Sequence, residues 1–375
     1  MILIVYILVT LVIIYCISLI FYIIGNLKKV QILQHNQLEP ISVIVAVKNG
    51  ELSLPNILTD LENQDYEGKV EFIIVDDQSI DNSKKIIQEF ENKNPQFKYI
   101  SSTNGNPKLN FKKKAIDAGI KNTNYNILLF TDVDCRLPNT WITSMAKSFN
   151  LEVDYVIGLS KVDVNSNNLI SLFQKIDLMM LFYVSRGMCN LNTPFASIGQ
   201  NQAYRKQLYQ KVGFLDIVES IQGDDTLFLQ LCVKHNIKVV FNDNSQSFVS
   251  SRIENKFWPF IKQRIRWAAD LKVMWNYNKK LFIISLSTFI SNMIILVLFL
   301  DCFIFKVFNY LDILYLLFLI KLILELLLYL IGSLKLKLKT NLFSFLYWFV
   351  LEIPYVVFMG IGSFFSTWIG WKQEK

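Results

Sequence analysis

Acidic residues stand in pairs at the ends of short apolar runs in this sequence. Asp132 and Asp134 follow the run NILLFT, and Asp76 and Asp77 follow the run VEFIIV. Two carboxylates at positions i and i+2 of a turn can converge on one hard divalent cation, which completes its shell with phosphate oxygens and water. A metal held in this way neutralises a diphosphate leaving group. Aspartate is also common in turns, so either pair alone fits ordinary turn chemistry, whereas the two pairs together predict a site.

A third acidic pair precedes an apolar helical run. Asp224 and Asp225 follow Gly223 and stand directly before Thr226–Leu229. A carboxylate at a helix N-terminus interacts favourably with the helix dipole, and one carboxylate is enough for that role. The second can act as a general base that takes a proton from an acceptor hydroxyl. From the residues alone, capping and catalysis remain equal interpretations of this pair.

Two arginines lie in an amphipathic, aromatic segment, Asn255–Tyr277, which is typical of a helix at a membrane interface. Arg264 and Arg266 stand between Gln263 and Trp267 there, in a chain whose basic residues are mostly lysine. Contact with lipid headgroups is one interpretation, but lysine would serve it equally well. Arginine instead indicates planar, bidentate recognition of a diphosphate, with Trp267 stacking nearby.

The middle of the chain predicts the elements that must bring these residues together. The predicted strands are Ile41–Val47, Val70–Asp76, Asn126–Thr131, Tyr155–Val164 and Lys238–Asn242. The predicted helices are Leu54–Asn63, Asn82–Asn92 and Lys112–Ile120. Such alternation predicts an α/β fold with a mostly parallel sheet covered on both faces. Ligands of these sheets bind beyond the carboxyl ends of the strands, where Lys48 and Asn49 join the first two acidic pairs.

Long apolar runs flank this middle region and predict membrane-spanning helices. They are Met1–Ile24, Leu281–Leu300, Tyr310–Ile331 and Asn341–Trp371. The first run is long enough to span the hydrocarbon core. It is interpreted as a retained helix, because a cleaved signal peptide would have a basic start and a shorter apolar stretch. The last run exceeds one span and contains Pro354, so it either crosses once with tilt or breaks and returns.

Lysines cluster beside these apolar runs and predict an orientation. The clusters are Lys28 and Lys29, Lys279 and Lys280, and Lys335, Lys337 and Lys339. With the middle region in the cytoplasm, all three clusters fall on the cytoplasmic side, as the positive-inside rule expects.

The composition argues against several classes of protein. Apolar residues make up 52% of the chain and charged residues 18%, against roughly 25% charged in soluble domains, which disfavours both a purely soluble and a disordered chain. Five cysteines without a C-x-x-C pair and only two histidines disfavour a disulfide framework, a structural zinc site and a histidine triad. Lys321 and Glu325 lie inside an apolar run, as in transport pathways, but their i, i+4 spacing also lets them pair.

Five segments together resemble a known family. They are Val75–Ser83 (VDDQSIDNS), Thr131–Cys135 (TDVDC), Gly199–Lys206 (GQNQAYRK), Gly223–Leu227 (GDDTL) and Gln263–Trp267 (QRIRW). In type and order, over residues 39–270, they resemble the membrane-bound glycosyltransferases of family 2, which have the GT-A fold. Two motifs depart from the family pattern: the first strand ends in VAVKNGE rather than P-A-R-N-E, and the E-D element reads Asp224-Asp225.

The resemblance implies a role for each matched residue. Asp76 or Asp77 would contact the uracil or ribose of the nucleotide, beside Lys48 and Asn49. Asp132 and Asp134 would hold the sugar diphosphate and a divalent metal, Mn²⁺ or Mg²⁺.

The remaining matches concern catalysis and the acceptor side. Asp225 aligns with the catalytic base of the family, with Asp224 beside it. Gln263, Arg264, Arg266 and Trp267 match the Q-x-x-R-W element, which covers the diphosphate and the acceptor.

The expected architecture has four parts. These are an N-terminal transmembrane helix at 1–25, a GT-A nucleotide-sugar domain at 39–254, an interfacial helix at 255–280 and about three C-terminal transmembrane helices at 281–371. The domain is expected to be α/β and Rossmann-like, with a mixed, mostly parallel sheet.

The expected function is that of an inverting, metal-dependent hexosyltransferase at the cytoplasmic face of the cell (inner) membrane. It would move a sugar from a nucleotide-sugar, UDP-linked, to a lipid or lipid-linked acceptor. The alternatives are a processive polysaccharide synthase of the same family, an inactive sugar-nucleotide-binding membrane protein and, from another class, a transporter. The expected partners are the donor, a lipid or glycan acceptor and the membrane, with no nucleic acid. The sequence does not indicate which sugar, which acceptor or which oligomeric state.

Overall fold

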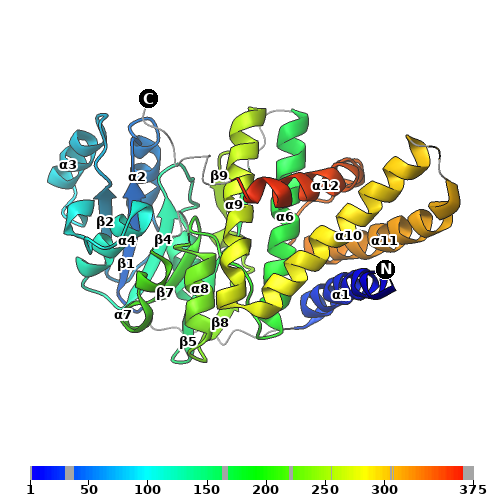
Figure 1. Ribbon diagram of the computed structural model, residues 1–375. Helices are drawn as coiled ribbons and strands as arrows, with labels where there is room; N and C mark the ends of the chain where they lie inside the picture. The colour runs from blue at the N-terminus through cyan, green and yellow to red at the C-terminus, as the bar shows by residue number, and fades with distance from the viewer. Residues whose placement is uncertain are drawn as a thin grey trace. The chain divides into compact units, whose positions relative to one another are not determined.

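The computed structural model describes residues 2–29, 38–162, 168–218, 223–254, 256–304, 306 and 308–365. The chain forms two compact units (Figure 1). The sheet unit comprises Val30–Asp163 and Cys189–Ile253, and the helical unit comprises Met1–Lys29, Val164–Met188 and Glu254–Lys375. The predicted segment ends at Met1, 163–164, Asn255 and 366–371 lie outside the described residues.

The sheet unit is built on a seven-stranded sheet in the order β3-β2-β1-β4-β7-β5-β8. Its strands are β1 (Ile41–Val47), β2 (Val70–Asp76), β3 (Phe97–Ser101), β4 (Ile127–Asp132), β5 (Val153–Ile157), β7 (Gln202–Arg205) and β8 (Lys238–Phe241). All neighbouring strands are parallel except β7, which is antiparallel to both β4 and β5. The predicted mixed, mostly parallel sheet is therefore confirmed.

The register of the central strands aligns the ends that carry the acidic residues. β1 lies between β2 and β4, with Val47 opposite Asp76 and Ala46 opposite Asp132. Because strands in a sheet lie about 4.8 Å apart, Asp76 and Asp132 sit two strand spacings, roughly 10 Å, from each other. The apolar, branched sequence of β1 explains its central position, since it is buried on both faces.

The single strand predicted at Tyr155–Val164 is instead two strands in different sheets. β5 ends at Ile157, and β6 (Ser160–Val162) pairs in parallel with β9 (Val249–Ser251) in a separate two-stranded sheet. Gly158 marks the break, because a Cβ atom there would lie 2.3 Å from the side chain of Asn201. Only glycine allows the chain to pass that close at this point.

Helices cover both faces of the sheet. The α-helices of the sheet unit are α2 (Leu54–Glu62), α3 (Ser83–Lys93), α4 (Phe111–Lys121), α5 (Trp141–Ala146), α7 (Lys206–Val212) and α8 (Thr226–Val233). The short 3-10 helices of the chain are η1 (Ser102–Asn104), η2 (Leu215–Ile217), η3 (Ser245–Ser247) and η4 (Phe308–Tyr310).

The two faces of the sheet have separate packing. Side chains of α2, α3 and α5 form one core with alternate residues of β1, such as Val43 and Val45. α4 covers the opposite face, where Gly119 approaches Ile44 of β1. Full burial of each such aliphatic side chain contributes about 1.5–3 kcal/mol, so this core stabilises the strands that carry the acidic residues.

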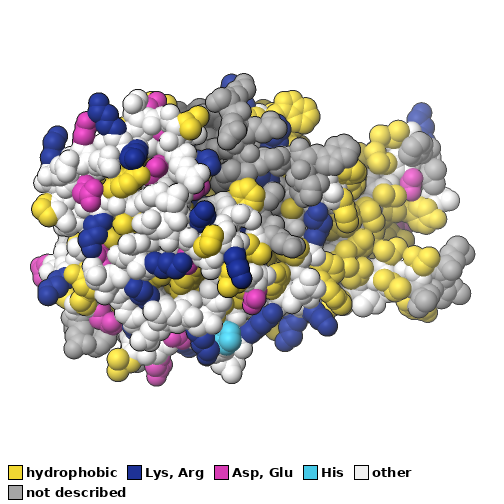
Figure 2. Space-filling view, turned by 60° about the vertical axis from the view of Figure 1, so that its left-hand side comes forward, with side chains coloured by type: hydrophobic (Ala, Val, Ile, Leu, Met, Phe, Trp, Pro, Cys, Tyr) yellow, Lys and Arg dark blue, Asp and Glu magenta, His cyan; other side chains and the backbone are white. Residues whose placement is uncertain are grey.

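The helical unit contains six helices among its described residues. They are α1 (Ile2–Leu27), α6 (Leu169–Asn190, of which the residues to Met188 belong to this unit), α9 (Phe257–Tyr277), α10 (Lys279–Phe303), α11 (Leu311–Lys335) and α12 (Leu342–Ser363). In length and composition, α1, α10, α11 and α12 suit a membrane span. This confirms the expected single N-terminal and three C-terminal candidate membrane helices. Their exposed side chains are largely hydrophobic (Figure 2).

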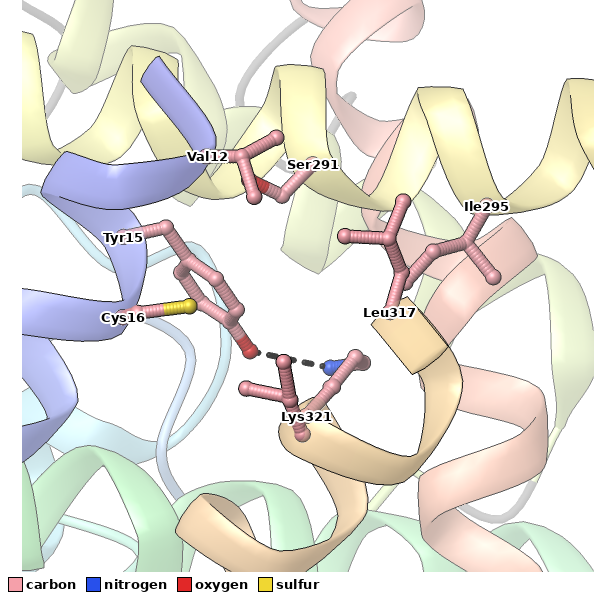
Figure 3. Close-up of a pocket in the computed structure, with 8 residues that line it drawn as sticks. Val12, Tyr15, Cys16, Ser291, Ile295, Leu317 and Lys321 are labelled. Carbon is pink, nitrogen blue, oxygen red and sulfur yellow. Dashed lines mark hydrogen bonds between the residues drawn. The ribbon is translucent and has the colours of Figure 1, made fainter. Parts of the chain in front are cut away.

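A buried ionic network ties three of these helices together. Lys321 Nζ of α11 lies 2.6 Å from Glu325 Oε1 and 2.7 Å from Glu352 Oε2 of α12. The Tyr15 hydroxyl of α1 donates to Glu325 Oε1 at 2.6 Å. Figure 3 shows the Lys321 ammonium hydrogen-bonded to the Tyr15 hydroxyl, at 3.2 Å. Both side chains line a small pocket with room for about one water molecule. Lys321 and Glu325 therefore pair as their spacing allows, and α12 supplies a second carboxylate.

Candidate active site

The carboxyl ends of β1 and β2, and the loops that follow these two strands, lie close together. Asp76, the last residue of β2, is buried and accepts hydrogen bonds from the backbone N–H of Ser79 at 3.1 Å and the Tyr99 hydroxyl at 3.5 Å. The Lys48 ammonium lies 3.9 Å from the Asp77 carboxylate. Asn49 Oδ1 accepts from the N–H of Ile80 at 2.9 Å. The sequence-predicted residues of these two loops therefore lie together.

The D-x-D turn leaves β4 beside them. Asp132 is half-buried and Asp134 is exposed, and the turn closes when the Cys135 N–H donates to the Asp132 carbonyl at 3.1 Å. Burial raises the pKa of the adjacent Cys135 thiol well above its ordinary value, so this cysteine stays a neutral thiol beside the carboxylates. Asp132 and Asp134 thus stand at the carboxyl end of β4, as their positions in the sequence predict.

The oxygen donors of this turn suit the divalent metal that the sequence predicts. Mg²⁺ and Mn²⁺ prefer carboxylate, phosphate and water oxygens, and Mg²⁺ is commonly bound through one or two carboxylates plus substrate phosphates. Within the described ranges, no three His, Cys, Asp or Glu side chains converge as a metal cage. Asp132 and Asp134 fit a metal that takes the rest of its ligands from a diphosphate and water.

A lysine links this turn to the third acidic pair. Lys112, in the first turn of α4, lies with its Nζ 2.7 Å from Asp132 Oδ1 and 3.1 Å from Asp224 Oδ2. Burial lowers the pKa of Lys112, but the charges of Asp132 and Asp224 outweigh that effect and raise it well above the ordinary lysine value. Lys112 is therefore a permanent cation between two carboxylates.

The two acids of the third pair occupy different environments. Asp225 is half-buried, and its carboxylate accepts from the backbone N–H of Thr226 at 2.5 Å and of Gly199 at 3.2 Å, which caps α8. Asp224 is buried and faces Lys112. Capping therefore belongs to the second acid of the pair, which is also the more accessible one.

A buried glutamine positions this pair. Gln202 of β7 donates from Nε2 to the backbone carbonyl of Asp224 at 3.1 Å, and its Oε1 accepts from the Tyr155 hydroxyl at 2.5 Å and from Ser197 at 3.0 Å. Because Gln202 is fully buried, this contact fixes the Asp224 backbone to the sheet.

The four residues of the Q-x-x-R-W segment lie on α9 of the helical unit. Arg264 is buried, lies 3.2 Å from Asp177 of α6 and stacks over the Trp267 ring with its guanidinium carbon 4.1 Å from the ring centre. Burial raises the pKa of Asp177, and the Arg264 charge opposes that rise. Gln263 and Arg266 lie on the same helix. Burial lowers the pKa of Arg266. Arg264 thus has a clear packing role within its own unit.

Comparison with known proteins places this geometry in a family. Residues 42–213 match the model of glycosyl transferase family 2. The chain carries a glycosyltransferase family 2 domain. The matched range contains Asp76, Asp77, Asp132, Asp134 and Lys112.

Curated relatives match part of this chain. It is 25% identical over 238 residues to a poly-beta-1,6-N-acetyl-D-glucosamine synthase of Staphylococcus epidermidis, covering 63% of this chain and 55% of that protein. It is 26% identical over 243 residues to a probable glycosyltransferase of Sulfolobus acidocaldarius, covering 63% and 50%. The chain therefore spans about half the length of the curated relatives it matches.

A solved structure resembles this chain over nearly its whole length. A mannosyltransferase of Pyrobaculum calidifontis, solved with GDP-mannose and Mn²⁺, has a TM-score of 0.60, covers 98% of this chain and 99% of its own, and is 12% identical. At that identity the likeness shows the fold alone. It supports the predicted GT-A-like sheet with flanking helices.

Two residues of the family 2 site escaped the sequence analysis. Lys112 was assigned to a helix only, because one lysine among Lys112, Lys113 and Lys114 carries no signal of its own. Gln202 was quoted within a motif but given no role. Its hydrogen bond to the carbonyl of Asp224 joins residues 22 positions apart, so no local sequence pattern marks it.

Proposed function

We propose that this protein is a metal-dependent glycosyltransferase that moves a sugar, with inversion at the anomeric carbon, from a nucleotide-sugar to an acceptor hydroxyl. The observation that carries the proposal is the convergence of Asp132 and the Asp224–Asp225 pair around Lys112, at the strand-end edge where Asp76 also lies. The family 2 model covers Asp76, Lys112 and Asp132. Buried and half-buried acids with a permanent cation suit a ligand that combines a ribose, a diphosphate and a metal. A UDP-linked sugar is the proposed donor.

Asp225 is the proposed general base. It is the accessible acid of its pair, whereas Asp224 faces an ammonium 3.1 Å away and is held as its counter-ion. Two backbone N–H groups orient the Asp225 carboxylate, so it can accept the acceptor's proton as the new bond forms. A divalent metal bound by Asp132 and Asp134 would supply charge neutralisation of the departing diphosphate. Asp76 or Asp77, with Lys48 and Asn49, is proposed to hold the nucleoside.

The Q-x-x-R-W segment is proposed to act on the diphosphate and acceptor. Arg266, whose planar fork suits two phosphate oxygens, is the proposed diphosphate ligand, with Gln263 and Trp267 beside it. Arg264 was also predicted to bind the diphosphate. Its pairing with Asp177 and its stacking on Trp267 instead favour the proposal that it orients Trp267.

The proposed acceptor is a lipid or lipid-linked molecule, and the proposed location of the site is the cytoplasmic face of the cell membrane. Four helices suited to a membrane span support an acceptor that resides in the membrane. The lysine clusters beside them support the orientation, because Lys28 and Lys29 follow α1 and Lys279 and Lys280 begin α10. A reporter fused after Lys280 would be active only as a cytoplasmic reporter, and periplasmic activity would contradict this orientation.

A processive polysaccharide synthase is the second candidate. The 25% identity to a poly-beta-1,6-N-acetyl-D-glucosamine synthase favours it. The two candidates differ in product, because a polymer grows with time at fixed enzyme, whereas a single transfer gives one product of constant size.

The test is a donor screen with membranes that contain the full chain. Panels of UDP- and GDP-linked sugars are supplied, and released nucleotide and new lipid-soluble product are scored. The proposal predicts nucleotide release from at least one donor, abolished by EDTA and restored by Mn²⁺ or Mg²⁺. Full activity in EDTA would remove the metal from the proposal, and release from no donor would contradict the activity itself.

A further inference from the structure

Lys112 is in contact with a residue that the proposed metal site also requires. Its Nζ lies 2.7 Å from Asp132 Oδ1, as a hydrogen bond, and 3.1 Å from Asp224 Oδ2. The backbone of Gly199 closes the space beside this ammonium, since a Cβ atom on Gly199 would lie 3.0 Å from Nζ and 3.1 Å from Asp224 Oδ2. The ammonium is therefore confined between the D-x-D turn and the N-terminus of α8.

The charges of this cluster make a metal and the lysine competitors. A divalent ion bound at Asp132 Oδ1 would lie within a few ångströms of the Lys112 ammonium, and like charges at that distance repel strongly in a partly buried site. One carboxylate oxygen cannot hold both the metal ion and the Lys112 ammonium tightly. While Lys112 is paired with Asp132, that carboxylate therefore attracts a metal ion less strongly.

A diphosphate changes this balance. It brings negative charge and new acceptor oxygens to the site, and lysine has a flexible stem of four carbons with rotatable N–H donors. The Lys112 side chain is 21% exposed, so the ammonium is not sealed from solvent. Moving the ammonium from Asp132 Oδ1 to a phosphate oxygen would free that oxygen for the metal.

We propose that Lys112 is a positioning residue that couples divalent-metal binding to nucleotide binding, by holding Asp132 until a nucleoside diphosphate takes over its ammonium. This inference rests on the proposed function in one respect, the use of Asp132 and Asp134 as metal ligands. Because coupling is reciprocal, the nucleotide tightens metal binding by the same factor as the metal tightens nucleotide binding.

The experiment measures Mn²⁺ binding to the purified full chain in detergent, by the electron paramagnetic resonance signal of free Mn²⁺. Titrations are made alone and with saturating UDP or GDP. The unmodified protein should bind Mn²⁺ weakly alone and about tenfold or more tightly with the nucleotide that binds. Lys112→Met and Lys112→Gln should bind Mn²⁺ about tenfold more tightly than the unmodified protein without nucleotide, and should lose most of the nucleotide-dependent gain.

Lys98→Met is the matched control. Lys98 also pairs with a carboxylate of the sheet unit, Glu71, at 2.8 Å, but Glu71 lies at the amino-terminal half of β2, away from the strand ends of the site. This variant should keep both the nucleotide-free Mn²⁺ affinity and the nucleotide-dependent gain. Melting temperatures of all variants show that each is folded.

Two different results separate this inference from the proposed function. If both Lys112 variants bind Mn²⁺ without nucleotide no more tightly than the unmodified protein, or keep the full gain, the coupling role is overturned. Asp134→Ala tests the metal site itself. If it leaves Mn²⁺ binding unchanged, the metal assignment of the proposed function fails, whatever Lys112 does.

Discussion

Each unit of this protein contains a lysine held between two carboxylates, and the two clusters differ chiefly in their access to water. In the sheet unit, the Lys112 side chain is 21% exposed, with Asp132 at 27% and Asp224 at 8%. In the helical unit, Lys321 is 1% exposed, with Glu325 at 5% and Glu352 at 7%. The distances from ammonium to carboxylate are alike, at 2.6–3.1 Å.

This difference in exposure decides whether the charged groups of each cluster can exchange partners. Charges that water and ligands reach can exchange partners, because solvent replaces a lost contact at little cost. Charges sealed among apolar helices cannot, since removing one leaves another buried and uncompensated. The Lys112 cluster therefore suits a site that binds ligands, and the Lys321 network suits the fixed packing of α1, α11 and α12.

The largest loss of stability is expected from removing the buried Lys321. Lys321→Met leaves two buried carboxylates without their cation, so the helical unit should lose about 3–5 kcal/mol of stability. Thermal unfolding of the purified chain in detergent measures this, with the exposed Lys339→Met as control.

The same network offers a sharper comparison. Glu352→Gln leaves one carboxylate for one ammonium and keeps an acceptor oxygen, so it should change stability by no more than about 1 kcal/mol. If Glu352→Gln were as damaging as Lys321→Met, charge balance would not be what holds this network.

The next effect concerns the open cluster and its metal. Asp134→Ala should lower the transfer rate by an amount equal to roughly 3–4 kcal/mol of transition-state stabilisation, as for other lost electrostatic groups, with the melting temperature almost unchanged because Asp134 is exposed. Initial rates with Mn²⁺ in excess measure the first quantity. A variant that transfers sugar normally would remove Asp134 from the site.

Two arginines on one helix provide an intermediate case. Arg264→Lys keeps the charge opposite Asp177 but loses the stacking over Trp267, so it should cost about 1–2 kcal/mol of stability. Arg266→Lys should instead weaken UDP binding and turnover with little change in stability. Melting curves and UDP calorimetry on both variants test this division, and an exchange of the two outcomes would reverse the assigned roles.

The Lys112 variant tests the contrast between the two clusters through its stability. Lys112 and Asp132 are partly exposed, whereas Asp224 is buried, so Lys112→Met leaves one buried carboxylate without its cation rather than two. It should cost clearly less than Lys321→Met, about 1–2 kcal/mol of unfolding free energy, while it alters metal binding. A loss comparable with that of Lys321→Met would show that both lysines are structural, and the contrast between the clusters would disappear.

The sequence predicts most of the parallel core. β1 and β2 match their predicted ranges in full, because short runs of branched apolar residues bounded by polar residues are typical of buried parallel strands. The acidic strand ends follow from those strands. The apolar helices are equally clear, and α12 continues through Pro354 as one helix to Ser363, so the break allowed at that proline is wrong within the described residues.

The rest depends on pairing between distant segments, which local patterns do not contain. β3 and β7 are only five and four residues long, too short for a local pattern to identify, and they are strands because neighbouring strands supply their hydrogen bonds. The sequence analysis contains no prediction for α6, a helix of the helical unit whose charged residues Asp177 and Arg186 are both buried. The contacts that place Lys112 and Gln202 at the site are equally distant along the chain, since Asp132 lies 20 positions from Lys112 and Asp224 lies 22 positions from Gln202.

Asp225→Asn gives the most direct test of the proposal that this domain transfers a sugar with Asp225 as base. The variant keeps the size and the capping oxygen of Asp225 but removes its basicity, so turnover with the donor found in the screen should fall steeply while UDP affinity stays almost unchanged. Both quantities are measured on the same purified full chain, with the unmodified protein alongside. Normal turnover would place the base elsewhere, with Asp224 the next candidate, and a parallel loss of UDP affinity would place Asp225 in the donor site and contradict the assigned mechanism.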